Sequence, residues 1–387
     1  MMKRSILVVA LAVLIPVLSI NVLSAAIKGP VKIGVVGPHV GPIAWLGEMQ
    51  LQGVKLAAEE INAAGGIGGQ KVELVFANDG ATPATSVASV KKLIHGDKVC
   101  AIIGPINSSC AIAVGPVVTE AKVPIFTNTL SPKVTEAKSP YVLRTRSTDD
   151  YNFEGVIEYL VNDRKYKKYG VIHDQTDFGM SGKEIILRNL GKYNIKPLAV
   201  EAINVEDKDF SGQLLKIKNS GAECLIVNTL GLVTGLMTKQ KIQLGMGNIV
   251  LAGAMGIEQI YFAKAAGGYE NPKNIEGVIF ASLTMCGDQR DPKTAEFCKR
   301  FNAKYKHDPI TAGSEGSDYD AVYMIKAAIE KTGSTDPVEI AKAVRTLNYQ
   351  GVCGTYRFNE SGDSLFSVDV VMFGDKVNVI LLKEKKR

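Results

Sequence analysis

The chain has 387 residues, of which 46% are hydrophobic and 22% are charged, and its formal net charge is +6. This ordinary globular composition excludes a disordered, collagen-like or polytopic membrane protein, and the length indicates two domains or one large one. With four His, a single Trp and no basic stripe carrying interleaved aromatic residues, the chain offers no zinc cluster and no nucleic-acid surface.

The first 26 residues resemble a secretory signal peptide. Lys3 and Arg4 form a basic start, residues 6–18 form an apolar core, and Ser24-Ala25-Ala26 supplies small residues for cleavage. Proline and polar residues interrupt the apolar run, which argues against an uncleaved membrane anchor. We therefore expect an exported, soluble mature chain.

From Val31 onward, short apolar runs alternate with helical patterns. In the first series we expect strands at 31–36, 72–76, 99–103, 123–126 and 141–144, with helices near 51–61, 86–94 and 109–121. A second series begins after residues 147–150, with strands at 169–172, 197–203 and 224–227, and helices at 179–192, 210–219 and 231–243. Such alternation predicts an α/β fold of two Rossmann-like lobes, each a parallel sheet with helices on both faces.

The C-terminal third departs from this alternation. A strand at 278–282 precedes helices at 292–305, 317–331 and 337–347, and two strands at 367–373 and 377–382 follow, with Gly374-Asp375 as the turn between them. This ending predicts that the chain returns to the first lobe and crosses back, so that several strands form a hinge. We expect one lobe to comprise residues 27–147 plus 282–352, and the other 148–281 plus 353–387.

Six cysteines lie beyond the signal peptide, and none forms a Cys-x-x-Cys pair, which argues against a redox or zinc motif. An exported protein meets an oxidising compartment, where disulfides are allowed. Cys286 and Cys298 are the nearest plausible pair, because a strand end and the following helix can approach each other. Cys224 lies in an apolar strand and is expected to be a small buried hydrophobe.

Enzymatic motifs are absent from the sequence. The glycines of Gly65-Gly66-Ile67-Gly68-Gly69 follow a helix and lack the Lys-Ser/Thr ending of a nucleotide loop, so they indicate a helix end and a turn. His173-Asp174 with Ser181 suggests a hydrolase only superficially, because no nucleophile-elbow motif accompanies them. We expect a structural role for His173 and no catalysis.

Loops at the carboxyl ends of the strands are better candidates for a site, because open α/β sheets bind ligands there. The loop Asn107-Ser108-Ser109 opens a helix and offers backbone N–H groups, a helix dipole and hydroxyls to a carboxylate, although either serine can simply be an N-cap. Asn128 and Thr129 follow the next strand. Trp45 offers a flat surface to a ligand or plugs its helix against the first lobe.

These segments together resemble the periplasmic solute-binding proteins of ABC importers, in the branched-chain amino-acid (Leu/Ile/Val) binding family. The resemblance covers the whole mature chain in order and rests on the following segments: Ile33-Gly34-Val35-Val36, Gly41-Pro42-Ile43-Ala44 with Gly47, Asn62-Ala63-Ala64-Gly65-Gly66-Ile67-Gly68-Gly69, Ile103-Gly104 with Ser108-Ser109, His173-Asp174 with Phe178-Gly179, and Tyr319-Asp320-Ala321-Val322.

The resemblance implies two lobes joined by three strands that close over a small ligand, with no cofactor and no metal. It places the ligand carboxylate on Asn107, Ser108 and Ser109 and near Asn128 and Thr129, where this chain is about one residue shorter than the family. Apolar contacts would come from Trp45, Leu46 and Phe178, and the second lobe would contribute Leu230 and Met255. The implied partner is an ABC permease in the inner membrane, the implied location is the periplasm, and we expect a monomer.

One position departs from the family pattern. Amino-acid binders of this family usually carry an acidic residue, which pairs with the ligand's ammonium group, where this chain has Met255. A buried ammonium without a counter-charge is costly. The sequence therefore favours a carboxylate ligand with an apolar or aromatic body and no amino group, unless Glu258 or Glu315 substitutes.

Two other function classes remain open at this stage. A periplasmic sensor that signals to a receptor would use the same pocket. A secreted α/β enzyme would need a base beside Ser108, and the sequence offers none.

Overall fold

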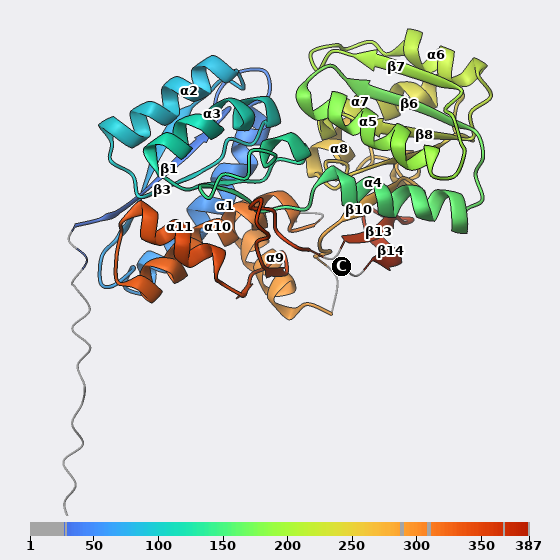
Figure 1. Cartoon of the computed structure of the whole chain (residues 1–387). Helices are drawn as coiled ribbons and strands as arrows, with labels where there is room; N and C mark the ends of the chain where they lie inside the picture. Colours follow the sequence, from blue (N-terminus) through green and yellow to red (C-terminus); the bar gives the residue numbers. More distant parts are fainter. Residues whose placement is uncertain (1–26, 28, 287–289, 308–310, 367, 386–387) are drawn as a thin grey trace, which may run out of the picture.

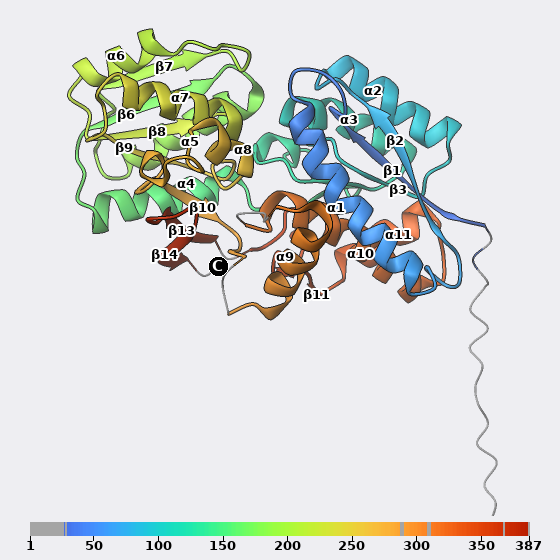
Figure 2. The ribbon, with the colours of Figure 1, turned by 180° about the vertical axis from the view of Figure 1, so that it is seen from behind.

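The computed structural model describes residues 27, 29–286, 290–307, 311–366 and 368–385. Within these ranges the chain forms two α/β lobes that lie side by side (Figures 1 and 2). The predicted signal peptide lies outside the described residues, as does Ser367, where a strand was predicted to begin. No helix in the described ranges is both long and apolar enough to cross a membrane.

The first lobe is built on a five-stranded parallel sheet with the order β2-β1-β3-β4-β5. Its central strands are short aliphatic runs with almost every residue buried, as expected where helices cover both faces of a parallel sheet. This sheet confirms the first predicted series. Its strands are β1 (Val31–Gly37), β2 (Val72–Asn78), β3 (Ala101–Ile103), β4 (Ile125–Thr127) and β5 (Val142–Arg144).

The second lobe is built on a seven-stranded sheet with the order β14-β13-β10-β9-β8-β6-β7. The strands from β6 to β10 are parallel, and β13 and β14 add an antiparallel edge beside β10. The final turn runs from Gly374 to Asn378 rather than over two residues, so β14 begins later than predicted. The strands are β6 (Tyr169–Asp174), β7 (Ala199–Ile203), β8 (Cys224–Asn228), β9 (Val250–Gly253), β10 (Ile279–Ser282), β13 (Val368–Phe373) and β14 (Val379–Lys385).

The helices that flank the two sheets begin where the sequence supplies capping residues. Thr82, Asn107, Thr176, Asp291 and Asp336 each accept a hydrogen bond from a backbone N–H of the first turn. The helices are α1 (Ala44–Ala63), α2 (Pro83–Lys91), η1 (Lys92–Gly96), α3 (Ser108–Ala121), η2 (Pro132–Val134), α4 (Asp149–Glu158), η3 (Tyr159–Asp163), α5 (Asp177–Gly191), α6 (Ser211–Asn219), α7 (Gly231–Gln243), α8 (Ile260–Ala265), η4 (Pro272–Asn274), α9 (Pro292–Tyr305), α10 (Gly313–Thr332) and α11 (Pro337–Arg345).

Several elements were not predicted, and the helices α1, α2 and α10 begin earlier than expected. Strand β9 and helix α8 are too short to give a clear period, and α4 opens on the polar run Asp149-Asp150-Tyr151-Asn152, which hides its apolar face. Helix α10 begins at Gly313 rather than at the predicted Ser317. Its first turn is polar yet buried, so the apolar pattern of the sequence did not reveal it. The structure also contains a small antiparallel hairpin of β11 (Tyr349–Gln350) and β12 (Thr355–Tyr356), which was not predicted.

The chain crosses between the lobes three times: after β5, after β10 and between β12 and β13. The first and third crossings are bonded to each other. Arg144 Nε lies 2.7 Å from Asp363 Oδ1, and the Ser364 hydroxyl donates to the Arg144 carbonyl. The Arg144 side chain is fully buried, so this ion pair anchors the segment that carries the chain from one lobe to the other.

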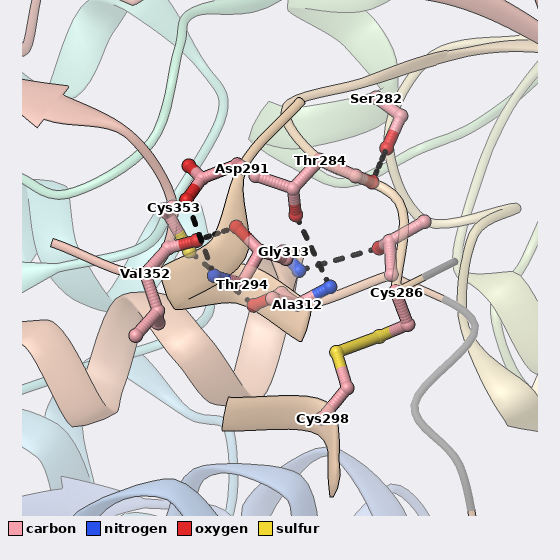
Figure 3. Close-up of a disulfide and its surroundings, with 11 residues drawn as sticks. Ser282, Thr284, Cys286, Asp291, Thr294, Cys298, Ala312, Gly313, Val352 and Cys353 are labelled. Atoms are coloured by element: carbon pink, nitrogen blue, oxygen red, sulfur yellow. Dashed lines mark hydrogen bonds between the residues drawn. A yellow bond between two sulfur atoms is a disulfide. The ribbon is translucent and has the colours of Figure 1, made fainter. Parts of the chain in front are cut away.

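A disulfide joins Cys286, which follows β10, to Cys298 on α9 (Figure 3). The two Cα atoms are 5.7 Å apart. The other four cysteines form no disulfide and are buried, and Cys224 is a fully buried member of the core of the sheet. The second crossing is thus tied covalently to the helix that follows it.

Candidate functional site

A cavity of about 240 Å³ lies between the lobes, at the carboxyl ends of the strands. Its volume is close to the lower end of the range for small-molecule pockets, about 300–1,000 Å³. Its walls come from both lobes, and eight of the ten predicted ligand-binding residues lie in them: Leu46, Asn107, Ser108, Asn128, Thr129, Phe178, Leu230 and Met255.

The other two predicted residues, Trp45 and Ser109, lie outside the cavity wall. Trp45 packs its ring on Tyr261 of the other lobe, with the ring centroids 5.0 Å apart. Ser109 follows Ser108 on α3, and one residue along a helix turns the side chain by about 100°. Ser108 therefore faces the cavity and Ser109 does not.

The serine loop ends at the N-terminus of α3 inside the cavity. Asn107 caps the helix through its side-chain oxygen, which accepts from Ser109 N at 3.1 Å, and Ser108 is buried. Thr127 joins this loop to the next one, because its hydroxyl donates to the Pro105 carbonyl at 2.6 Å. The arrangement gives a hydroxyl and a helix N-terminus to a negatively charged group.

Apolar side chains form the facing walls. Leu46 and Met49 come from α1 of the first lobe. The second lobe supplies Phe178 at the start of α5, Leu230 just before α7, and Met255 after β9. These side chains suit the apolar body of a small ligand.

Three charged residues that the sequence pattern did not single out also line the cavity: the exposed Glu206 and two buried residues, Arg146 and Asp318. Arg146 lies in the first crossing, only 3% exposed, and pairs with Glu258 of the second lobe. Asp318 lies on α10, only 1% exposed, and its Oδ2 accepts from Asn128 Nδ2 at 3.0 Å. The signal available in the sequence was the polar stretch Ser314-Glu315-Gly316-Ser317-Asp318 inside a helix, which a solvated face explains equally well.

The buried acids of this region resist ionisation. Burial raises the pKa of Asp318 well above its ordinary value, although Arg146 opposes the shift. Burial also raises the pKa of Glu258 and raises that of Glu315 to about 7. Glu258 and Glu315, the two residues proposed from sequence as substitutes for the missing acid, are not in the cavity wall.

Direct contacts join the lobes around the cavity. The hydroxyl of Ser181 on α5 donates to Ser131 Oγ at 3.0 Å, and Gln259 Nε2 donates to Ser314 Oγ at 3.3 Å. The lobes thus enclose the cavity between them in this structure.

The residues that superficially suggest enzymes have structural roles. His173 lies 2.8 Å through Nδ1 from the Asp174 carbonyl and is buried at the end of β6. Gly65 and Gly66 follow the end of α1 with φ angles of 99° and 81°, as a helix end and turn require.

Comparison with known proteins gives a consistent result. Residues 30–370 match the family described as periplasmic binding protein. The chain is 31% identical over 358 residues to an amino acid binding protein of Pseudomonas aeruginosa, covering 91% of this chain and 92% of the relative. It is also 31% identical over 356 residues to Leu/Ile/Val-binding protein homolog 3 of Brucella melitensis, covering 91% and 94%.

Solved structures share the fold. A leucine binding protein of Thermotoga maritima superposes with a TM-score of 0.82 at 24% identity, over 92% of this chain and 99% of that one. An ABC transporter solute binding protein of R. palustris in complex with benzoate gives a TM-score of 0.83 at 19% identity, over 92% and 96%. The chain therefore belongs to the periplasmic binding protein family, alongside the Leu/Ile/Val-binding proteins, and is a substrate-binding protein rather than an enzyme.

Proposed function

We propose that this protein is the exported substrate-binding component of an ABC importer, and that it captures a small carboxylate with an apolar body by closing its two lobes. It would work in the periplasm and deliver its ligand to a permease in the inner membrane. The relatives support this class, since they include binding proteins named for branched-chain amino acids and a structure with benzoate.

The observation that carries the proposal is the position of Ser108. Its hydroxyl and the N-terminus of α3 lie in one wall of a cavity whose other walls are largely apolar and come from both lobes. A ligand with a carboxylate at one end and an apolar body at the other would contact both lobes at once. Such contacts favour the closed arrangement.

A thermal-shift screen tests the proposal directly. The mature protein is heated with leucine, valine and phenylalanine, with their 2-oxo acids, and with benzoate. A ligand at 100 times its Kd adds about 2.7 kcal/mol to the free energy of unfolding, which gives a visible rise in Tm. Small-angle scattering of the same samples should show a lower radius of gyration with ligand, as closure requires.

Two serine variants provide the matched control. Ser108→Ala should weaken binding of the active acid by at least about tenfold, because it removes a hydrogen bond to a charged group. Ser109→Ala should leave the affinity unchanged, since Ser109 lies outside the cavity wall. If none of these acids raises the Tm, or if both variants lose affinity equally, the proposed site is wrong.

A further inference from the structure

Asp318 has an unsatisfied oxygen in the cavity wall. The side chain is 1% exposed, and Oδ1 has no hydrogen-bond partner among the described residues. Its other oxygen is held by Asn128, so the carboxyl group has a fixed orientation. A buried polar atom left without a partner costs about 1–3 kcal/mol, which a ligand group can recover.

Arg146 is the cation that acts on Asp318, and it is already paired with another acid. We define the buried charge cluster as Arg146, Glu258, Glu315 and Asp318. It contains one cation, Arg146, whose Nη2 is already paired with Glu258. Among the described residues, no other lysine or arginine lies in the cavity wall.

We propose that Asp318 is the counter-charge for an ammonium group on the ligand, so that the ligand is an α-amino acid rather than the corresponding acid without an amino group. This inference rests on the proposed function, in which the ligand carboxylate lies at Ser108. It moves the ammonium partner from the second-lobe position of Met255 to helix α10 of the first lobe.

The surroundings of Asp318 connect it to the expected carboxylate site. Asn128, which holds Asp318, directly follows Thr127, which is bonded to the loop that leads to Ser108. An α-amino acid carries its ammonium and carboxylate on adjacent carbon atoms, so it needs two such sites close together on one wall. Met255 and Phe178 then face its apolar side chain from the other lobe.

Binding of an ammonium group at Asp318 should change the protonation of its carboxyl group. The charged or titratable groups that act on this carboxyl are Arg146 and Glu315, with Glu258 beyond Arg146, and burial holds its pKa above the ordinary range. A nearby ammonium favours the ionised carboxylate, so binding an amino acid should release a proton to the buffer. A 2-oxo acid has no such cation and should release none at this group.

Isothermal titration calorimetry on the mature protein tests the proposal with two ligand pairs. These are leucine with 4-methyl-2-oxopentanoate, and phenylalanine with phenylpyruvate. The wild type should bind the amino acid of at least one pair more tightly than its 2-oxo acid. Asp318→Asn should weaken amino-acid binding by about thirtyfold or more, as expected for an unpaired buried charge, and should leave the 2-oxo acid within about threefold.

Glu330→Gln is the matched control, because it removes an acid from a half-exposed position on the same helix, outside the cavity wall. It should preserve the ratio of the two affinities. The comparison of the amino acid with its 2-oxo acid on the wild type needs no variant, so the test holds even where Asp318→Asn fails to fold.

The outcomes distinguish a failure of the Asp318 proposal from a failure of the proposed function. Tighter binding of the 2-oxo acid, or equal losses for both ligands in Asp318→Asn, would each overturn the role of Asp318 and leave the proposed function standing. Failure of the wild type to bind either class would overturn the proposed function itself.

Discussion

The phenol of Tyr261 on α8 donates a hydrogen bond to Glu48 Oε2 on α1 across the mouth of the cleft, at 2.6 Å. Trp45, on the same face of α1, packs against the Tyr261 ring. We call these three residues the rim contact. None of them lines the cavity, so the rim contact joins the lobes without touching the space for the ligand. It can therefore stabilise the closed arrangement independently of ligand chemistry.

Tyr261→Phe removes this hydrogen bond and keeps the ring. Because the bond contributes about 1 kcal/mol to the closed arrangement, we expect the Kd of the ligand to rise about fivefold, mainly through faster dissociation. The matched control is Tyr323→Phe, which removes a tyrosine bond to Glu60 at 3.1 Å within the first lobe. Stopped-flow measurement of ligand release would contradict the prediction if both variants release the ligand at the wild-type rate.

The sequence was sufficient to predict most strands of the two large sheets, because buried parallel strands give dense aliphatic runs such as Val31–Gly37 and Cys224–Asn228. It was also sufficient to predict part of the cavity wall, because strand ends and helix starts mark the binding edge of an α/β sheet. Ser108 was found in this way, whereas Met255 on the other lobe came from the family resemblance.

The buried charges were not predictable by the same reasoning. Asp318 is brought to the cavity by the packing of α10 against the first sheet, and its partner Asn128 is 190 residues away in sequence. The contact of Trp45 with Tyr261 was not predictable for a related reason, since it depends on how the two lobes meet. Contacts between distant segments leave no periodic signal in the chain.

The disulfide should stabilise the protein by restricting the unfolded chain, by an amount that grows with the logarithm of the loop length. Cys286 and Cys298 are 12 residues apart, and a loop of this size corresponds to about 3 kcal/mol of chain entropy in the unfolded state. We expect the double substitution Cys286→Ser, Cys298→Ser to lower the free energy of unfolding by about 2–3 kcal/mol in urea titrations. A reducing agent should destabilise the wild type and leave the double variant unchanged, whereas equal effects on both would contradict the assignment.

Gly53 on α1 allows a close approach to α10. A Cβ atom at this position would lie 2.2 Å from the Glu315 carbonyl oxygen. Alanine normally stabilises a helix interior relative to glycine, but here we expect Gly53→Ala to lower the free energy of unfolding by about 2 kcal/mol, because backbone atoms must move. Gly212→Ala on α6 is the control. With nothing within 4 Å of its Cβ position, it should stabilise the protein by about 0.5–1 kcal/mol. Chemical denaturation compares the two, and equal signs would refute the packing argument.

Glu315 should make the stability of the protein depend on pH. Burial raises its pKa to about 7, so the native state holds a proton that the unfolded chain has already released. The free energy of unfolding therefore falls as the pH rises from the ordinary glutamate pKa to about 7. Glu315→Gln has no proton to lose, so its stability relative to the wild type should increase between pH 5 and pH 8, by about 2 kcal/mol. Glu330→Gln, at a half-exposed position on the same helix, should show no comparable change. Urea titrations at the two pH values measure this difference, and parallel curves for Glu315→Gln and the wild type would contradict the raised pKa.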